Sequence, residues 1–210
     1  MRKLFVIIVL AVCARASYAQ DRFLDYFLQR ADTSAVSFAF GSRSLDAAGN
    51  VLSEQTGSGT AQKGAFRLDE GAISLYSDGV KRWTLDSSSK EAVSQRIPKG
   101  AAPDLLTDPV QFLLDVRAGL KEEFAGTARF RGRPAHAIFF EPGNLPGLGA
   151  GARVKLYMRE GVLFAAVTED SKGNVVEVSF RQMKLSPRLP SSEFVPDLKS
   201  LGNGWVVTEL

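Results

Sequence analysis

Few side chains in this sequence have the type and spacing that covalent chemistry requires. His136 is the only histidine, and it stands between Ala135 and Ala137 in a segment of apolar residues. A Ser-His-Asp site would need this ring, but the sequence contains no G-x-S-x-G motif to present a serine nucleophile. We therefore expect a structural histidine and a protein that is not an enzyme. An enzyme acting on lipid or glycan stays open as an alternative, in which loss of His136 or of a buried acid would abolish turnover.

The remaining polar clusters do not form a cofactor or metal site by sequence. Glu122-Glu123 and Asp69-Glu70 are neighbours in expected strands, where adjacent side chains point to opposite faces. The glycine-rich stretch 147–151 lacks the lysine of a phosphate-binding loop and no strand-to-helix unit surrounds it. With one histidine and one cysteine, zinc ligands are too few. We expect no catalytic residues, no metal and no cofactor.

The first nineteen residues have the pattern of a cleavable secretory signal. Basic residues at positions 2 and 3 precede the apolar run 4–12, and Ser17 and Ala19 are the small residues that a signal peptidase reads. The run is too short to cross a bilayer. We predict a signal peptide over 1–19 and a single domain over 20–210. A lipidated N-terminus at Cys13 is the alternative, although Val12 fits that signal poorly.

Composition indicates one ordinary globular domain of 210 residues, 45% hydrophobic and 23% charged. Cleavage would reduce the formal net charge from +3 to zero. Three of the 26 Lys and Arg lie in the signal, so 23 remain against 23 Asp and Glu. A nucleic-acid partner, which needs a surplus of Lys and Arg, is therefore not expected.

Apolar periodicity predicts two helices. The first covers 20–31, with Phe23, Leu24, Phe27 and Leu28 on one face. The second starts at Asp108-Pro109, an acidic N-cap followed by proline in the first turn, and stops at Gly119.

Most of the remaining chain alternates with period two and predicts a series of strands with turn residues between them. Residues 142–151, rich in Gly and Pro, predict a loop. Together these elements predict one antiparallel, strongly curved sheet or open barrel with two helices against one face. The expected strands are 36–40, 52–63, 66–69, 73–77, 81–86, 91–97, 123–130, 135–140, 153–158, 162–168, 175–183 and 205–207.

An ordered set of short motifs runs along this pattern. In order they are Ser37-Phe38-Ala39-Phe40, Gly57-Ser58-Gly59-Thr60, Lys63-Gly64-Ala65-Phe66-Arg67, Ser77-Asp78-Gly79-Val80-Lys81-Arg82-Trp83-Thr84-Leu85, the helix start at Asp108 and Phe194-Val195-Pro196. The set resembles the outer-membrane lipoprotein carrier proteins of the LolA type, over most of residues 20–210. Three positions depart from the family: Leu85 replaces its tyrosine, Glu91 its glutamine, and Lys63-Gly64 stands where it has an Arg-Pro pair whose arginine tethers the lid.

The resemblance implies a mainly β (α+β) fold, an unclosed antiparallel half-barrel whose concave apolar face is capped by a helical lid. It also implies a periplasmic carrier or chaperone that binds acyl chains and moves lipoproteins from the inner to the outer membrane. The implied partners are acylated lipoproteins, an inner-membrane lipoprotein-releasing transporter and an outer-membrane acceptor, with the carrier itself a monomer. Exposing each methylene to water costs about 0.8 kcal/mol, so acyl chains need a protein cover.

The phase of the strands selects candidate lipid-binding residues, each of which has an ordinary core position as its alternative. Phe112 and Leu113 would lie on the lid. The remaining candidates are Val36, Phe38, Phe40, Phe66, Leu68, Ile73, Leu75, Trp83, Leu85, Leu156 and Met158.

Two other functions are compatible with the same fold. One is an envelope regulator that senses lipid or a mislocalised lipoprotein, although such proteins usually have a second domain. The other, which lipidation of Cys13 would favour, is an anchored outer-membrane lipoprotein acceptor.

Overall fold

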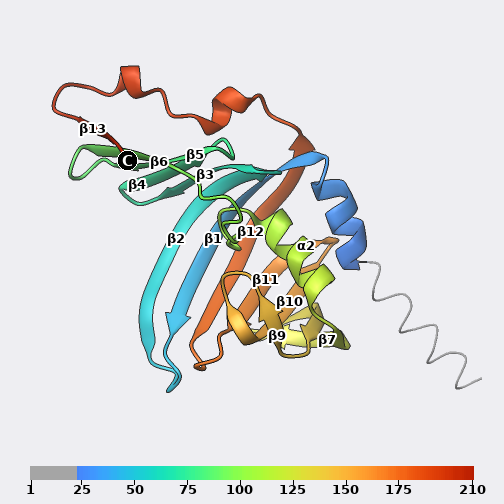
Figure 1. Cartoon of the computed structure of the whole chain (residues 1–210). Coiled ribbons are helices and arrows are strands. Elements are labelled where there is room, and N and C mark those ends of the chain that lie inside the picture. The colour runs from blue at the N-terminus through green and yellow to red at the C-terminus, as the bar shows by residue number, and fades with distance from the viewer. Residues whose placement is uncertain (1–22) are drawn as a thin grey trace, which may run out of the picture.

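The computed structural model describes residues 23–210, drawn in colour in Figure 1. The predicted signal peptide, Cys13 and the start of the first predicted helix lie outside the described residues.

The described chain is built around one large curved sheet that does not close on itself (Figure 1), as the half-barrel expectation requires. Its strand order is β13-β6-β5-β4-β3-β2-β1-β12-β11-β10-β8-β7, and β9 pairs only with β10. The strands are β1 (Ser34–Leu45), β2 (Val51–Gln62), β3 (Ala65–Glu70), β4 (Ile73–Ser77), β5 (Lys81–Asp86), β6 (Glu91–Arg96), β7 (Glu122–Phe130), β8 (Arg133–Phe140), β9 (Gly143–Leu145), β10 (Gly149–Arg159), β11 (Val162–Glu169), β12 (Val175–Pro187) and β13 (Val206–Glu209).

One strand departs from the antiparallel expectation. β13 pairs with β6 in parallel, whereas the other strand pairs run antiparallel. The cause is the preceding segment, residues 188–205, which we call the C-terminal arm. It runs past β5 and β6 before the chain turns into β13, so the last strand meets the edge of β6 in the same direction (Figure 1). The arm contains two short 3₁₀ helices, η1 (Ser191–Phe194) and η2 (Leu198–Ser200).

The prediction of a loop over 142–151 was wrong. This stretch contains β9 and the first residues of β10, which pair with each other through Leu145 and Gly149. Gly149 and Gly151 have φ of +81° and +79°, in the left-handed region that glycine adopts without steric cost. Glycine thus permits an irregular strand pair with a register shift, which composition alone reads as a loop.

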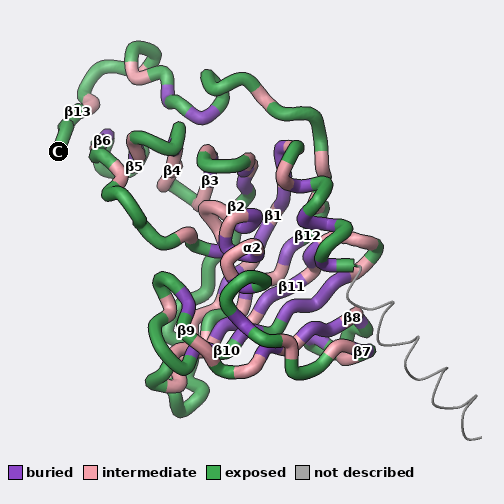
Figure 2. The backbone as a smooth tube through the Cα atoms, turned by 45° about the vertical axis from the view of Figure 1, so that its right-hand side comes forward, coloured by how far each residue is buried: buried purple, intermediate pink, exposed green. Residues whose placement is uncertain are grey.

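Two helices cover the concave face of the sheet. The first is helical over 23–31 in the described part, and the second is α2 (Pro109–Gly119). Leu24, Phe27 and Leu28 of the first helix are buried as predicted, but Phe23 is 38% exposed and lies against the His136 ring, 4.6 Å between centroids. Buried residues concentrate on the central strands behind α2 (Figure 2).

Among the described residues, we find no helix that is long and apolar enough to span a membrane.

Candidate functional site

The candidate site lies between the concave face of the sheet and α2. α2 begins where the sequence predicts: Asp108 accepts a hydrogen bond from the Gln111 backbone N–H at 3.0 Å, and Pro109 occupies the first turn. Val110, Phe112, Leu113 and Val116 of α2 are buried. They form one apolar cluster with residues of the first helix and of the sheet, which makes α2 a lid over this face.

Most predicted lipid-binding residues belong to this cluster. Leu75 is half-buried and packs against it. In the described structure these side chains are in contact with one another as a core rather than around an open cavity. The predicted residues within the cluster are Val36, Phe38, Phe40, Phe66, Leu68, Phe112, Leu113, Leu156 and Met158.

Trp83 and Leu85 do not lie on the predicted face. The register pairs Trp83 with Tyr76 and Leu85 with Ser74, whereas the concave-facing Leu75 pairs with Thr84. Because directly paired residues share a face, Trp83 and Leu85 lie on the outer side of the sheet. Trp83 is nevertheless only 8% exposed. Ile73 shares the concave phase of Leu75 but is half-buried and stands outside the main cluster.

An open apolar cleft of about 300 Å³ remains beside α2. Its wall combines Phe112 with Leu105 and Leu106 from the segment before α2, Leu148 from the β9–β10 turn and Val178 of β12. Of the predicted lipid-binding residues within 23–210, Phe112 alone lines it. The volume is at the lower end of known ligand pockets, enough for part of one apolar chain.

The sequence contained a signal for the missed cleft residues. Leu148 lies in the stretch interpreted as a loop, and Leu105 and Leu106 lie in the unassigned segment just before the second predicted helix. Apolar residues outside regular elements are a signal because loops on a protein surface are usually polar. Val176 and Val178 alternate in a predicted strand, but their place opposite the loops depends on tertiary structure.

Two polar groups of the site have unusual surroundings. Burial raises the pKa of Asp108 above its usual range, and N–H donors from Gln111 and Gly64 offset this only in part. Arg82 lies on the concave side with its guanidinium 5.7 Å from the centre of the Phe66 ring, and its buried Nε atom has no hydrogen-bond partner among the described residues.

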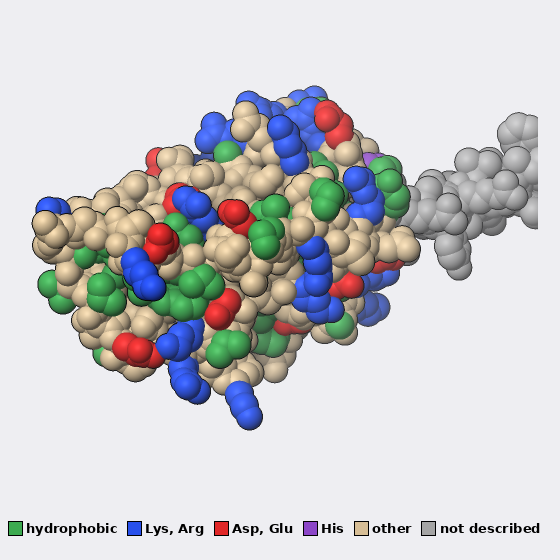
Figure 3. All heavy atoms as spheres, turned by 90° about the horizontal axis from the view of Figure 1, so that it is seen from above, with side chains coloured by type: hydrophobic (Ala, Val, Ile, Leu, Met, Phe, Trp, Pro, Cys, Tyr) green, Lys and Arg blue, Asp and Glu red, His purple; other side chains and the backbone are tan. Residues whose placement is uncertain are grey.

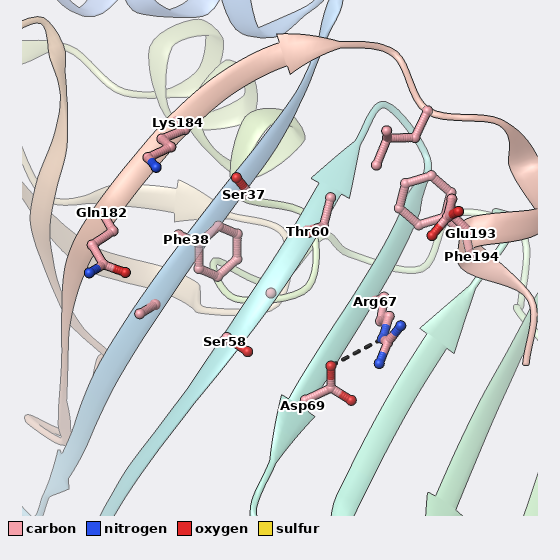
Figure 4. Close-up of a pocket in the computed structure, with 13 residues that line it drawn as sticks. Ser37, Phe38, Ser58, Thr60, Arg67, Asp69, Gln182, Lys184, Glu193 and Phe194 are labelled. Carbon is pink, nitrogen blue, oxygen red and sulfur yellow. Dashed lines mark hydrogen bonds and ion pairs between the residues drawn. The ribbon is translucent and has the colours of Figure 1, made fainter.

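A second hollow, of about 360 Å³, lies on the outer face beneath the C-terminal arm. Figure 4 shows Arg67 and Asp69 joined on β3, at 3.0 Å, with Glu193 and Phe194 of the arm beside them. Its wall is mixed and charged, which suits an acyl chain poorly.

The described residues do not bring a catalytic group together around His136. Its side chain makes no hydrogen bond or ion pair within 23–210, and its ring contacts Phe23. Within the same residues no three His, Cys, Asp or Glu side chains gather in a way that could hold a metal ion.

No family model matches the sequence, and no curated protein matches it. Several solved structures are similar to the chain in fold. An uncharacterized conserved protein from Thermus thermophilus superposes with a TM-score of 0.51 at 14% identity, covering 91% of this chain and 99% of that one. A LolA superfamily protein from Nitrosomonas europaea gives 0.42 at 12% identity, covering 82% and 97%.

MucB in the Pseudomonas aeruginosa MucA/MucB complex gives a TM-score of 0.40 at 17% identity, covering 85% of this chain and 61% of that one. These similarities concern the fold.

Proposed function

We propose that the chain is a periplasmic carrier or chaperone for acylated lipoproteins, which binds acyl chains between the half-barrel and its lid without covalent chemistry. The observation that supports this most directly is the composition of the main core. It consists of contacts between the concave face and two helices, so movement of those helices would uncover a continuous apolar trough.

The size of the cleft makes lid movement part of the proposal. At about 300 Å³ the cleft can receive part of one acyl chain, whereas a triacyl group needs more room. The first helix is connected to α2 by an ion pair of partly exposed side chains, Arg117 to Asp25 at 3.1 Å, and exposed pairs contribute little free energy. A weak polar link between the two helices suits a carrier, whose helices must move in order to release cargo as well as to bind it.

The proposed route follows from the same resemblance in sequence. Cargo would come from an inner-membrane lipoprotein-releasing transporter and pass to an outer-membrane acceptor. A lipid-sensing regulator would use the same cavity and would differ by holding its ligand while bound to a regulatory partner.

Native mass spectrometry of the protein purified from the periplasm, with and without added triacylated lipoprotein, tests the proposal. We expect copurified lipid or a stoichiometric complex. Phe112→Glu, in the lid, and Leu148→Glu, a half-buried residue at the rim of the cleft, should each abolish the complex. Val80→Glu, which adds the same charge at a 63% exposed position in a turn, should retain it.

Circular dichroism separates a binding defect from unfolding. Leu148→Glu is the safer variant because its side chain is only partly buried. A folded Leu148→Glu protein that binds cargo as the unmodified chain does would exclude the cleft. If the unmodified protein carries no lipid and does not bind acylated cargo, the carrier function is rejected and only the similarity of fold stands.

A further inference from the structure

The outer face of the second half of the sheet carries a row of aromatic rings that the lid and the cleft do not use. We call Phe124, Phe139, Tyr157, Phe130 and Phe164 the aromatic row. Successive ring centroids in that order are 5.1, 5.9, 5.2 and 6.0 Å apart. The register places the row opposite the concave face, because Phe139 and Tyr157 alternate with Ile138 and Leu156, which belong to the main core.

Three cations lie over this row. Arg131 stands 5.4 Å from the centre of the Phe130 ring, Lys155 5.5 Å from Phe139, and Arg159 5.2 Å from Phe164. Phe130 and Tyr157 are only 6% and 7% exposed. The surface therefore presents guanidinium and ammonium groups supported by rings, with most of the apolar area underneath.

A β-bulge directs Phe164 into this surface. In the β10–β11 pair, Tyr157 lies opposite Ala165 and Met158 opposite Leu163, so Phe164 is an extra residue without a partner in the register. A bulge re-aims the side chain that it inserts. Here the Phe164 ring meets Phe130 edge-on, on the outer side.

Two adjoining hollows, of about 380 and 320 Å³, open around Phe164. Both are lined by Arg133 and Arg181, one also by Arg131 and the other by Arg159. The two hollows share Arg133, Phe164, Phe180 and Arg181, which lie on β8, β11 and β12, and we call the pair of hollows the groove. Seen from above, Lys and Arg side chains gather along the upper edge of the molecule (Figure 3).

The two shared arginines have no partner among the described residues. Arg131 is paired with Glu177 at 2.5 Å, and Arg159 reaches Glu160 at 3.9 Å. By contrast, the exposed side chains of Arg133 and Arg181 make no ion pair, hydrogen bond or ring contact with any residue of 23–210. A guanidinium offers a planar fork of donors that matches a carboxylate, and both forks are available here.

We propose that this groove binds an extended acidic segment of a partner protein. Two of its carboxylates pair with Arg133 and Arg181, and an apolar side chain between them enters the hollow beside Phe164. Arginine and aromatic residues are enriched at protein interfaces, and the groove supplies both at one place.

The geometry favours a peptide over a membrane surface. Binding to an anionic bilayer commonly uses aromatic residues that reach the headgroup layer, whereas Phe130 and Tyr157 are buried under the cations. Phe124, the ring of the row that is 41% exposed, does not line either hollow. Separate hollows between arginines fit individual side chains. Phe180 and Leu163 of the main core line part of the groove, but none of the residues that line the cleft does. The groove can therefore be tested separately from the carrier proposal.

Fluorescence anisotropy with the mature chain tests the proposal. The probe is a fluorescein-labelled peptide in which Glu alternates with Leu, compared with the same peptide carrying Lys in place of Glu. We expect the acidic peptide to bind and the basic peptide not to bind. The double variant Arg133→Glu/Arg181→Glu should bind the acidic peptide about tenfold more weakly than the unmodified chain. The matched control is Lys99→Glu/Lys172→Glu, which makes the same charge change at exposed residues outside the groove and should bind normally.

Three outcomes would overturn the proposal. The first is equal binding of the acidic and basic peptides, and the second is equal loss in both double variants. The third is that the protein does not bind the acidic peptide. If the protein instead cosediments with phosphatidylglycerol vesicles, the groove binds a membrane surface.

Discussion

Asp108 and Gly64 connect the lid to the sheet. The Asp108 carboxylate, which caps the start of α2, also accepts a hydrogen bond from the backbone N–H of Gly64 in the turn between β2 and β3. Gly64 has φ of +78°, a left-handed conformation that favours glycine. At this turn the family that the sequence resembles has an Arg-Pro pair. Here a backbone donor makes the contact with the lid.

The Asp108 contact predicts opposite effects for two variants. Asp108→Ala removes the cap and the link to Gly64, and should destabilise the fold by about 1 kcal/mol. Asp108→Asn keeps a capping oxygen without the buried charge, so it should be at least as stable as the unmodified protein at neutral pH. Thermal unfolding of both variants checks this, and equal destabilisation by Asn and Ala would contradict it.

The same carboxyl predicts a pH dependence. Because burial raises the pKa of Asp108 in the folded state, the folded chain holds this proton more tightly than the unfolded chain. Its contribution to stability is therefore present below the ordinary pKa of 3.8 and is lost as pH rises through the folded value. Urea unfolding across acidic pH should show this loss in the unmodified protein and not in Asp108→Asn.

The two glycines of the Gly57-Ser58-Gly59 motif make room for aromatic rings of β1. A Cβ atom at Gly57 would lie 2.7 Å from the Phe40 ring and would also meet the backbone oxygen of Asp69, which cannot move aside. We predict that Gly57→Ala destabilises the fold by about 1–3 kcal/mol. Gly202→Ala, where nothing lies within 4 Å, is the control and should be neutral or slightly stabilising in urea unfolding.

Arg82 gives a prediction about ligand preference. Its half-buried side chain lies on the concave side, and its buried Nε makes no hydrogen bond within the described residues, so an anionic head group that reached it on lid movement would supply the missing acceptor. We expect oleate to bind better than oleyl alcohol, and Arg82→Met to remove that preference. The unbranched methionine side chain can pack against Phe66 in place of the arginine stem, so the variant should stay folded. Competition binding measures the preference. An unchanged preference in the variant would show that Arg82 does not meet the head group.

Lys63 is predicted to matter little. Its Nζ lies 3.1 Å from the Asp32 carboxylate just after the first helix, but both side chains are about half exposed. Lys63→Ala should cost roughly 0.2–1 kcal/mol, and less in 1 M salt, because exposed ion pairs are weak and screened. Urea unfolding at low and high salt measures this. A loss above about 2 kcal/mol would show that this ion pair is a main attachment of the first helix to the sheet, which an exposed pair is not expected to be.

Local chemistry explains which parts of the fold could be predicted. The alternation of Val36, Phe38 and Phe40, and the Asp108-Pro109 helix start, depend on neighbours in sequence, and the structure confirms them. Alternation also shows that Trp83 and Leu85 share a face, but not which one. The structure places both on the outer face, where Trp83 is buried and Leu85 half-buried, because of contacts that local sequence patterns do not reveal.

The missed features all require partners that are distant in sequence. The pairing of β9 with β10, the parallel docking of β13 on β6 and the cleft between Leu106, Leu148 and Val178 exist only once the sheet is assembled. The groove around Arg133 and Arg181 could not be predicted either, because each stands in a different strand and β10 and β11 lie between those strands in the sheet.

The position of β1 in the sheet has a consequence for the timing of folding. β1 is flanked by β2, its neighbour in sequence, and by β12, whose Pro187 pairs with Ser34. During synthesis, β1 therefore cannot pair along its second edge until nearly the whole chain has been made. Such non-local pairing makes folding slow. The native pairing of β1 with β12 can therefore form only after residues up to Pro187 have been synthesised, so the complete sheet assembles after nearly all of the chain has left the ribosome.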